Sequence, residues 1–144
     1  LVRLRLWHHP DIWKKPLLWS LYLSQVFITI GLLMLGLRLI VYVPSFLAIH
    51  AFAYGGIGLV TLGMMARVSW GHSGRDVFNP PALLNWVFAL LFIGAMVRVF
   101  LPLVIGHYAI LVLIAQVFWI ASFGLFLWLY MPVFIKPRID GRFG

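Results

Sequence analysis

Long apolar runs alternate with short polar connections along the chain. Each run is long enough to cross a bilayer as one α-helix of about 20 residues, and Pro44 and Pro80 lie in connections, where helices end. A membrane-spanning β-strand would alternate polar and apolar positions over about ten residues, and these continuous runs do not. The pattern predicts an all-α integral membrane bundle of four transmembrane helices, at about residues 16–38, 46–69, 82–101 and 107–131.

Polar segments flank this predicted membrane domain. Residues 1–15 place basic residues among Leu and Trp and are predicted to form an interfacial segment; the alternative is the end of a preceding helix. Residues 16–135 are predicted to form the four-helix transmembrane domain, and residues 136–144 form a basic tail. Because the chain begins with Leu1, we expect a fragment, a processed product or the ordered part of a longer protein.

The composition favours a lipid environment. Hydrophobic residues make up 64% of the chain and charged residues only 10%, whereas about a quarter of the residues in a soluble domain are charged. A net charge of +8 is one sign of a nucleic-acid partner. Here the charges flank the apolar runs and form no stripe along a helix, so we expect a bilayer and no nucleic acid.

The distribution of basic residues predicts the topology. Four spans place both termini and the middle connection on one side of the membrane, and that side carries nine of the eleven Lys and Arg residues. The positive-inside rule assigns this side to the cytoplasm. The nine residues are Arg3, Arg5, Lys14, Lys15, Arg67, Arg75, Lys136, Arg138 and Arg142.

The second predicted span is rich in small residues and polar groups. Gly55 and Gly56 allow the close approach of either another helix or a flat cofactor, and both interpretations stay open. At 100° per residue, the polar side chains of this span share one face. Such a face normally points into a bundle. The residues on it are His50, Tyr54, Thr61, Met65 and, if the helix continues, His72.

Two histidines of this region are candidate metal ligands. His50 is a candidate axial haem ligand or copper ligand, because neutral imidazole suits both; the alternative is a hydrogen bond to a backbone carbonyl. His72 lies in the loop 71–75, which with Arg75 forms either an anion-binding loop or a simple surface turn. The two histidines are 22 positions apart, about 33 Å along a helix, so they would serve two separate sites.

The charged residues limit the possible chemistry. The only acids, Asp11, Asp76 and Asp140, lie outside the spans, which excludes a carboxylate proton relay or a paired-carboxylate catalytic site in the membrane. Arg67 and Arg98 either snorkel to the surface or pair with an anionic cofactor group. The chain has no cysteine, so disulfides, Fe–S clusters and thiolate metal sites are excluded. We predict no catalytic residue and no independent enzyme.

A series of motifs resembles the NnrS family. It runs from His50-Ala51 through a Gly-rich helix and Met65-Ala66-Arg67 to a Gly-His-Ser-Gly-Arg loop, with Ser73 where the family has Thr. The closing residues 136–144 resemble the family's C-terminal signature. The resemblance implies a haem- and copper-containing protein of the bacterial inner membrane, linked to nitric oxide, denitrification or respiratory redox metabolism; the charge distribution places its termini in the cytoplasm. It makes His50 and His72 the leading ligand candidates for haem b or copper.

Two departures from the family pattern keep another function open. The first span has Tyr22 where a histidine is expected, and the resemblance covers about the last third of a typical member with roughly twelve spans. The alternative is a cofactor-free accessory subunit of a larger respiratory or other energy-transducing membrane complex. The hypothesis of a small channel or transporter has the least support, because few polar residues lie near the midplane of the membrane.

Overall fold

The computed structural model describes residues 2–141, except for the side chain of Arg3. Helices make up most of the described part of the chain, which contains no strand. Four of them are long and apolar enough to cross a membrane, which confirms the predicted all-α bundle of a multi-pass membrane protein. These spans are Pro16–Leu37, Ser45–His72, Leu84–Leu103 and Tyr108–Ile135.

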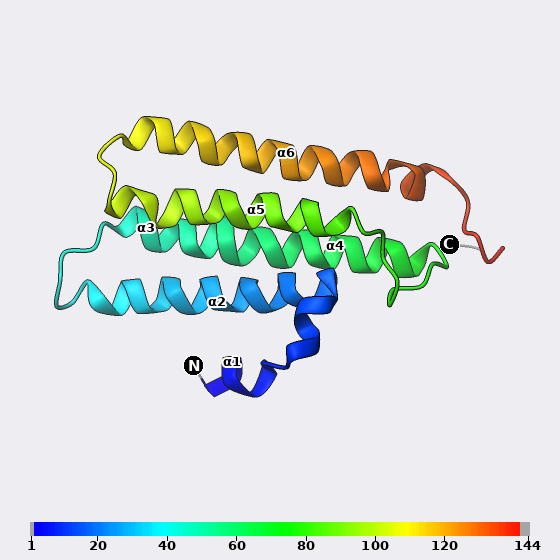
Figure 1. Cartoon of the computed structure of the whole chain (residues 1–144), viewed down its shortest axis with the longest axis horizontal. Helices are drawn as coiled ribbons and strands as arrows, with labels where there is room; N and C mark the ends of the chain where they lie inside the picture. Colours follow the sequence, from blue (N-terminus) through cyan, green and yellow to red (C-terminus); the bar gives the residue numbers. More distant parts are fainter. Residues whose placement is uncertain (1, 142–144) are drawn as a thin grey trace.

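The spans are antiparallel neighbours, joined by short connections (Figure 1). A short arm precedes them, and the segment 73–83 and the C-terminal residues lie at the same end of the bundle as the start of the first span. The elements are α1 (Val2–Trp7), the 3₁₀ turn η1 (Pro10–Lys14), α2 (Pro16–Leu37), α3 (Ser45–His50), the π-helix η2 (Ala51–Ile57), α4 (Gly58–His72), α5 (Leu84–Val99), the 3₁₀ turn η3 (Leu101–Leu103) and α6 (Tyr108–Ile135).

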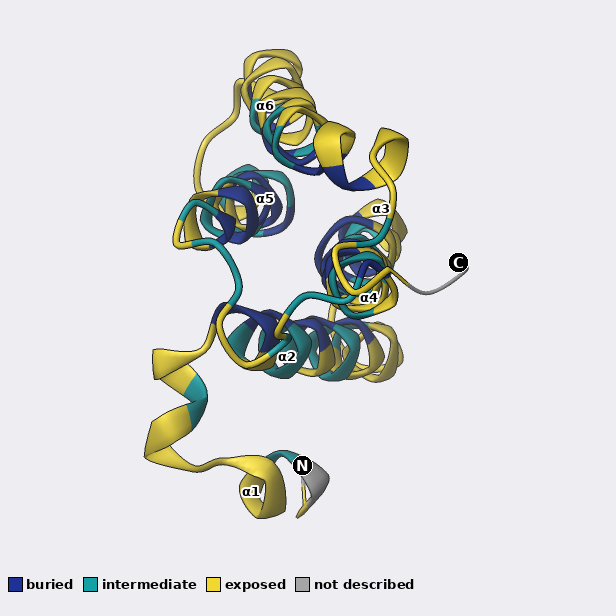
Figure 2. Ribbon diagram, turned by 90° about the vertical axis from the view of Figure 1, so that its right-hand side faces the viewer, coloured by how far each residue is buried: buried dark blue, intermediate teal, exposed yellow. Residues whose placement is uncertain are grey.

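The buried residues lie where the four spans face one another (Figure 2). Phe27 of α2, Leu62 of α4, Phe88 of α5 and Phe126 of α6 are almost fully buried in one core. Helix α6 packs mainly on α5, and most of its outer surface is exposed and apolar. Exposed apolar surface of this extent is expected for helices surrounded by lipid.

The second span is not a regular α-helix, and this changes which residues face inward. The π-helix η2 inserts one extra residue into its turns. Beyond η2, the face that begins at Tyr54 therefore continues one position later than the sequence predicts. The inward face passes through the buried residues Leu62, Ala66 and Ser73. The residues predicted for this face, Thr61, Met65 and His72, are exposed. The prediction of one inward polar face was therefore wrong beyond η2.

Glycines in this span are positions of close helix packing. A Cβ atom on Gly55 would overlap the ring of Phe27 in α2, and one on Gly56 would lie 2.7 Å from Cγ1 of Ile28. These contacts match the helix-packing interpretation of the two glycines. A role for Gly55 and Gly56 in binding a flat cofactor stays a prediction.

Candidate functional site

His50 is the last residue of α3 and is held by hydrogen bonds on both ring nitrogens. Its Nδ1 lies 2.5 Å from the carbonyl oxygen of Phe46, one turn earlier. Its Nε2 lies 2.9 Å from Nη2 of Arg98, which comes from α5. A carbonyl only accepts hydrogen bonds and a guanidinium only donates them. The proton therefore sits on Nδ1, and Nε2 presents its lone pair.

Arg98 is a half-buried cation in the last turn of α5, without a carboxylate partner among residues 2–141. Its Cζ lies 5.2 Å from the ring centre of Tyr108, at the start of α6, which is a cation–π distance. Its Nη1 is buried and has no hydrogen-bond partner in the described structure. A buried donor of this kind is costly to leave unsatisfied. Arg98 is thus suited to bind an anionic group beside His50.

A groove opens next to His50, between η2 and α6. It measures about 260 Å³ and is lined by His50, Ala53, Tyr54, Gln116 and Trp119. Tyr54 fixes the floor of this groove because its hydroxyl donates to the carbonyl oxygen of Ala115 in α6, at 2.6 Å. The lining combines an imidazole, an amide and aromatic side chains, as small-molecule sites commonly do.

His72 lies at the other end of the same span and is exposed. It lines a second groove together with Met64, Arg67, Val68, Gly71, Val77 and Arg138. The predicted partner Arg75 is not in this lining; its guanidinium stacks on the ring of Trp70 at 5.2 Å. The structure therefore brings His72 together with Arg67 and Arg138. His50 and His72 are separated by the length of the span, so they cannot bind one metal ion.

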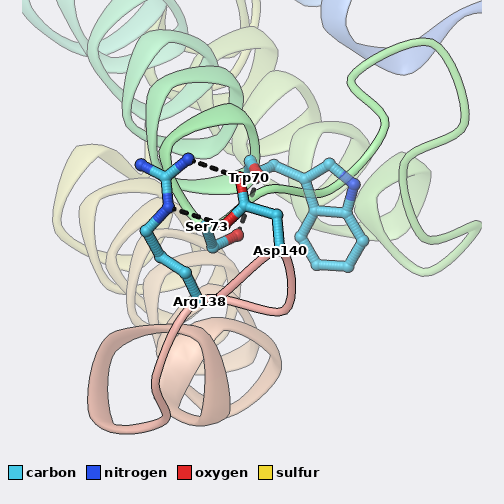
Figure 3. A network of polar contacts seen from close by, with 4 residues as sticks. All are labelled: Trp70, Ser73, Arg138 and Asp140. Carbon is cyan, nitrogen blue, oxygen red and sulfur yellow. Dashed lines mark hydrogen bonds and ion pairs between the residues drawn. The ribbon is translucent and has the colours of Figure 1, made fainter. Parts of the chain in front are cut away.

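The C-terminal segment docks on the loop that follows His72 (Figure 3). The backbone N–H of Ile139 donates to the carbonyl oxygen of Ser73 at 3.2 Å, and the Ser73 hydroxyl donates to the carbonyl oxygen of Trp70 at 2.8 Å. Asp140 lies against Gly74, whose φ of 79° suits glycine. The two family-like motifs, which are far apart in the sequence, thus meet in the structure.

Arg138 is the groove residue that the sequence did not single out. Its Nε and Nη2 donate to the two carboxylate oxygens of Asp140, at 2.9 and 2.7 Å. This hydrogen bonding raises the pKa of Arg138 above its usual value. The only sequence signal was its place in the closing signature, because no spacing rule links the tail to the loop 71–75.

The described residues contain no group of three or more His, Cys, Asp or Glu side chains that could hold a metal ion. Neither candidate histidine therefore belongs to a cluster of three or more such side chains within the part of the chain described. One imidazole is enough for an axial haem ligand. A copper centre needs further ligands, and these histidines alone do not supply them.

Tyr22, which stands where the family pattern has a histidine, lies under the N-terminal arm. The ring of His8 is 5.8 Å from its ring centre, and the ring of Trp13 is also at 5.8 Å, in an edge-on arrangement. The arm is thus packed on α2 through aromatic contacts. At the position where the family pattern has a histidine, the first span thus has a tyrosine that contacts the N-terminal arm.

Comparison with known proteins gives one family. The sequence model of the NnrS protein family matches residues 1–138, nearly the whole chain. No curated protein and no solved structure matches it significantly. The membrane-spanning helices, the loop 71–75 and Arg138 are within the matched region, whereas Ile139 and Asp140 of the docked segment follow it. The chain therefore belongs to the NnrS family.

Proposed function

We propose that this NnrS family protein binds haem b in the groove beside His50, where Nε2 of His50 would hold the haem iron. We place it in the bacterial inner membrane, with both termini in the cytoplasm. Its role is in nitric oxide response, denitrification or respiratory redox metabolism. Bound haem would supply reversible one-electron chemistry and a site for small diatomic ligands.

The observation that carries this proposal is the pair of hydrogen bonds on His50. Metal-bound histidines commonly donate from the second ring nitrogen to a backbone carbonyl, which fixes the tautomer and the ring orientation. In His50 the Phe46 carbonyl holds Nδ1, so the lone pair of Nε2 points to Arg98. His72 has no hydrogen bond of this kind to a described residue, so we favour His50 over His72 as the ligand.

Arg98 supports haem over a bare metal ion. Haem carries two propionate carboxylates, and a guanidinium pairs well with a carboxylate. The unpartnered Nη1 of Arg98 gives such a group a donor close to the proposed ligand. Arg98 would exchange its bond to Nε2 for one to the cofactor. The groove beside His50 is open on one side, so further membrane helices could complete the pocket.

We expect His50→Ala to lose at least about 90% of the haem bound per protein, because the axial ligand is removed. The measurement is the reduced-minus-oxidised absorbance spectrum of protein purified in mild detergent. His107→Ala is the matched control, since His107 is an exposed histidine near the same end of the bundle and lies at the N-cap of α6. Size-exclusion chromatography reports whether each variant is folded.

Other outcomes would change the assignment. A haem band that survives in His50→Ala but is lost in His72→Ala would move the ligand to the opposite end of the span. A band that survives in both would place the haem on another chain. Absence of haem and copper from the wild-type protein would contradict the proposal.

One feature favours an accessory subunit as the second candidate. Helix α6 is packed on one side only (Figure 2), and its exposed surface carries large aromatic residues such as Trp128. The polar Gln116 is also exposed, in the lining of the groove beside His50, and a polar side chain exposed on a span indicates contact with another helix or a bound group rather than with lipid. Stoichiometric co-purification with other membrane subunits, without any chromophore, would support this function.

A further inference from the structure

The groove at His72 is lined by both apolar and basic side chains. Its α4 residues follow helical spacing i, i+3, i+4, i+7 and i+8, so they form one continuous strip. The strip carries apolar side chains at Met64 and Val68, the basic Arg67 between them, and His72 at the end of the helix. The residues of the strip are Met64, Arg67, Val68, Gly71 and His72.

The shape of the groove follows from its borders. Gly71 has no side chain, which leaves a hollow in the middle of the strip. Val77 from the loop forms one wall, and a Cβ atom on Gly71 would lie 3.2 Å from its Cγ1. Arg138 from the C-terminal segment forms the other wall. The groove measures about 380 Å³ and is open to the surroundings.

The charge of the groove is positive. Asp140 accepts both hydrogen bonds of Arg138 and offsets its charge. Arg67 is exposed and forms no ion pair with any of residues 2–141. Arg67 lies five residues before the end of α4, about 7.5 Å along the helix. This is the depth of lipid headgroups when the helix end lies at the membrane surface.

We propose that this groove is a binding site for an anionic phospholipid. The headgroup phosphate binds Arg67 near His72, and an acyl chain lies along Met64 and Val68, which are 44% and 45% exposed. A phospholipid combines the complementary chemistry in one molecule, an anionic phosphate for Arg67 and an apolar chain for Met64 and Val68. Basic pockets at the ends of membrane helices bind anionic lipids in this way. The docked tail shapes the site through Arg138.

The test uses haem-free, full-length protein in mild detergent, so its result is independent of the haem proposal. Native mass spectrometry would measure the binding of phosphatidylglycerol and of phosphatidylcholine with identical acyl chains. We expect the wild type to bind phosphatidylglycerol more tightly. Arg67→Gln should weaken that binding about fivefold, the effect of one basic group near the surface, and leave phosphatidylcholine unchanged.

Two variants separate this site from general charge effects. Arg67→Lys keeps the charge and should keep the preference for phosphatidylglycerol. Arg38→Gln removes the same charge at the opposite end of the bundle, where Arg38 follows α2, and should change nothing. The proposal is overturned by equal affinity for both lipids, by wild-type binding in Arg67→Gln, or by an equal loss in Arg38→Gln.

Discussion

Gly94→Ala is expected to destabilise the bundle by about 2–4 kcal/mol, as overpacking and a lost hydrogen bond together predict. The new Cβ atom would overlap the hydroxyl of Tyr54 and lie 2.9 Å from Cβ of Phe118. Tyr54 could avoid the overlap only by giving up its bond to the Ala115 carbonyl. The midpoint of thermal unfolding in detergent should fall by roughly 5–10 °C.

Two comparisons make this prediction specific. Gly124→Ala in α6 is the matched control, because its new Cβ would have no heavy atom within 4 Å, and it should not lower the midpoint. Tyr54→Phe removes the overlapping hydroxyl, so it should partly rescue Gly94→Ala in a double-mutant cycle. Equal effects of the two glycine replacements, or purely additive effects of the tyrosine change, would contradict the packing described here.

This packing also links stability to the proposed haem groove. Tyr54 lines the groove with His50, and its hydroxyl ties η2 to α6 across the groove floor. Gly94 leaves the space in α5 that lets the Tyr54 ring pass between these helices. A change at Gly94 should therefore disturb the groove, although Gly94 does not line it.

The four spans could be predicted from the sequence because each depends on a local property. An uninterrupted apolar run has one stable state in a bilayer, in which the helix satisfies its own backbone hydrogen bonds. The loop 71–75 and the tail were recognisable as motifs, but their contact was not. Ile139 and Ser73 are joined by a backbone hydrogen bond, which has no signature in side-chain type or spacing.

The partner of His50 was also beyond sequence reasoning. The sequence identified His50 as a candidate ligand and Arg98 as a cation that either snorkels or pairs with an anionic group. The two residues are 48 positions apart, and nothing in the sequence linked them. Whether they meet depends on the rotation of two helices about their axes. That rotation is set by packing at positions such as Gly94 and Gly55, where missing side chains make room for Tyr54 and Phe27.

The π-helix η2 was the largest departure from the sequence-based picture, and its cause is tertiary. Tyr54, Gly55 and Gly56 are buried in succession, with Tyr54 directed to α5 and α6 and the two glycines against α2. A wider turn accommodates contacts on both sides. The residue types of Ala51–Ile57 do not themselves demand a π-helix, so a regular helix was the natural expectation.

Inserting one alanine between Ile57 and Gly58 is therefore expected to abolish the folded bundle. The insertion rotates everything after η2 by about 100°, which moves Thr61 and Met65 to the buried positions of Leu62 and Ala66. Replacing a buried leucine by threonine costs roughly 2–4 kcal/mol, and forcing methionine into an alanine site costs roughly 1–3 kcal/mol. The sum is comparable to the whole stability of a typical domain.

Deleting Ile57 is the opposite test, and we expect it to be tolerated. Ile57 is 59% exposed at the end of η2, and its loss lets a regular α-helix keep both Tyr54 and Leu62 on the inward face. Fluorescence-detected size-exclusion chromatography should show a monodisperse peak for the deletion and an aggregated or absent peak for the insertion. If the two variants behaved alike, the extra residue in η2 would not set the register of α4. The exposed Thr61 and Met65 would then need a different explanation.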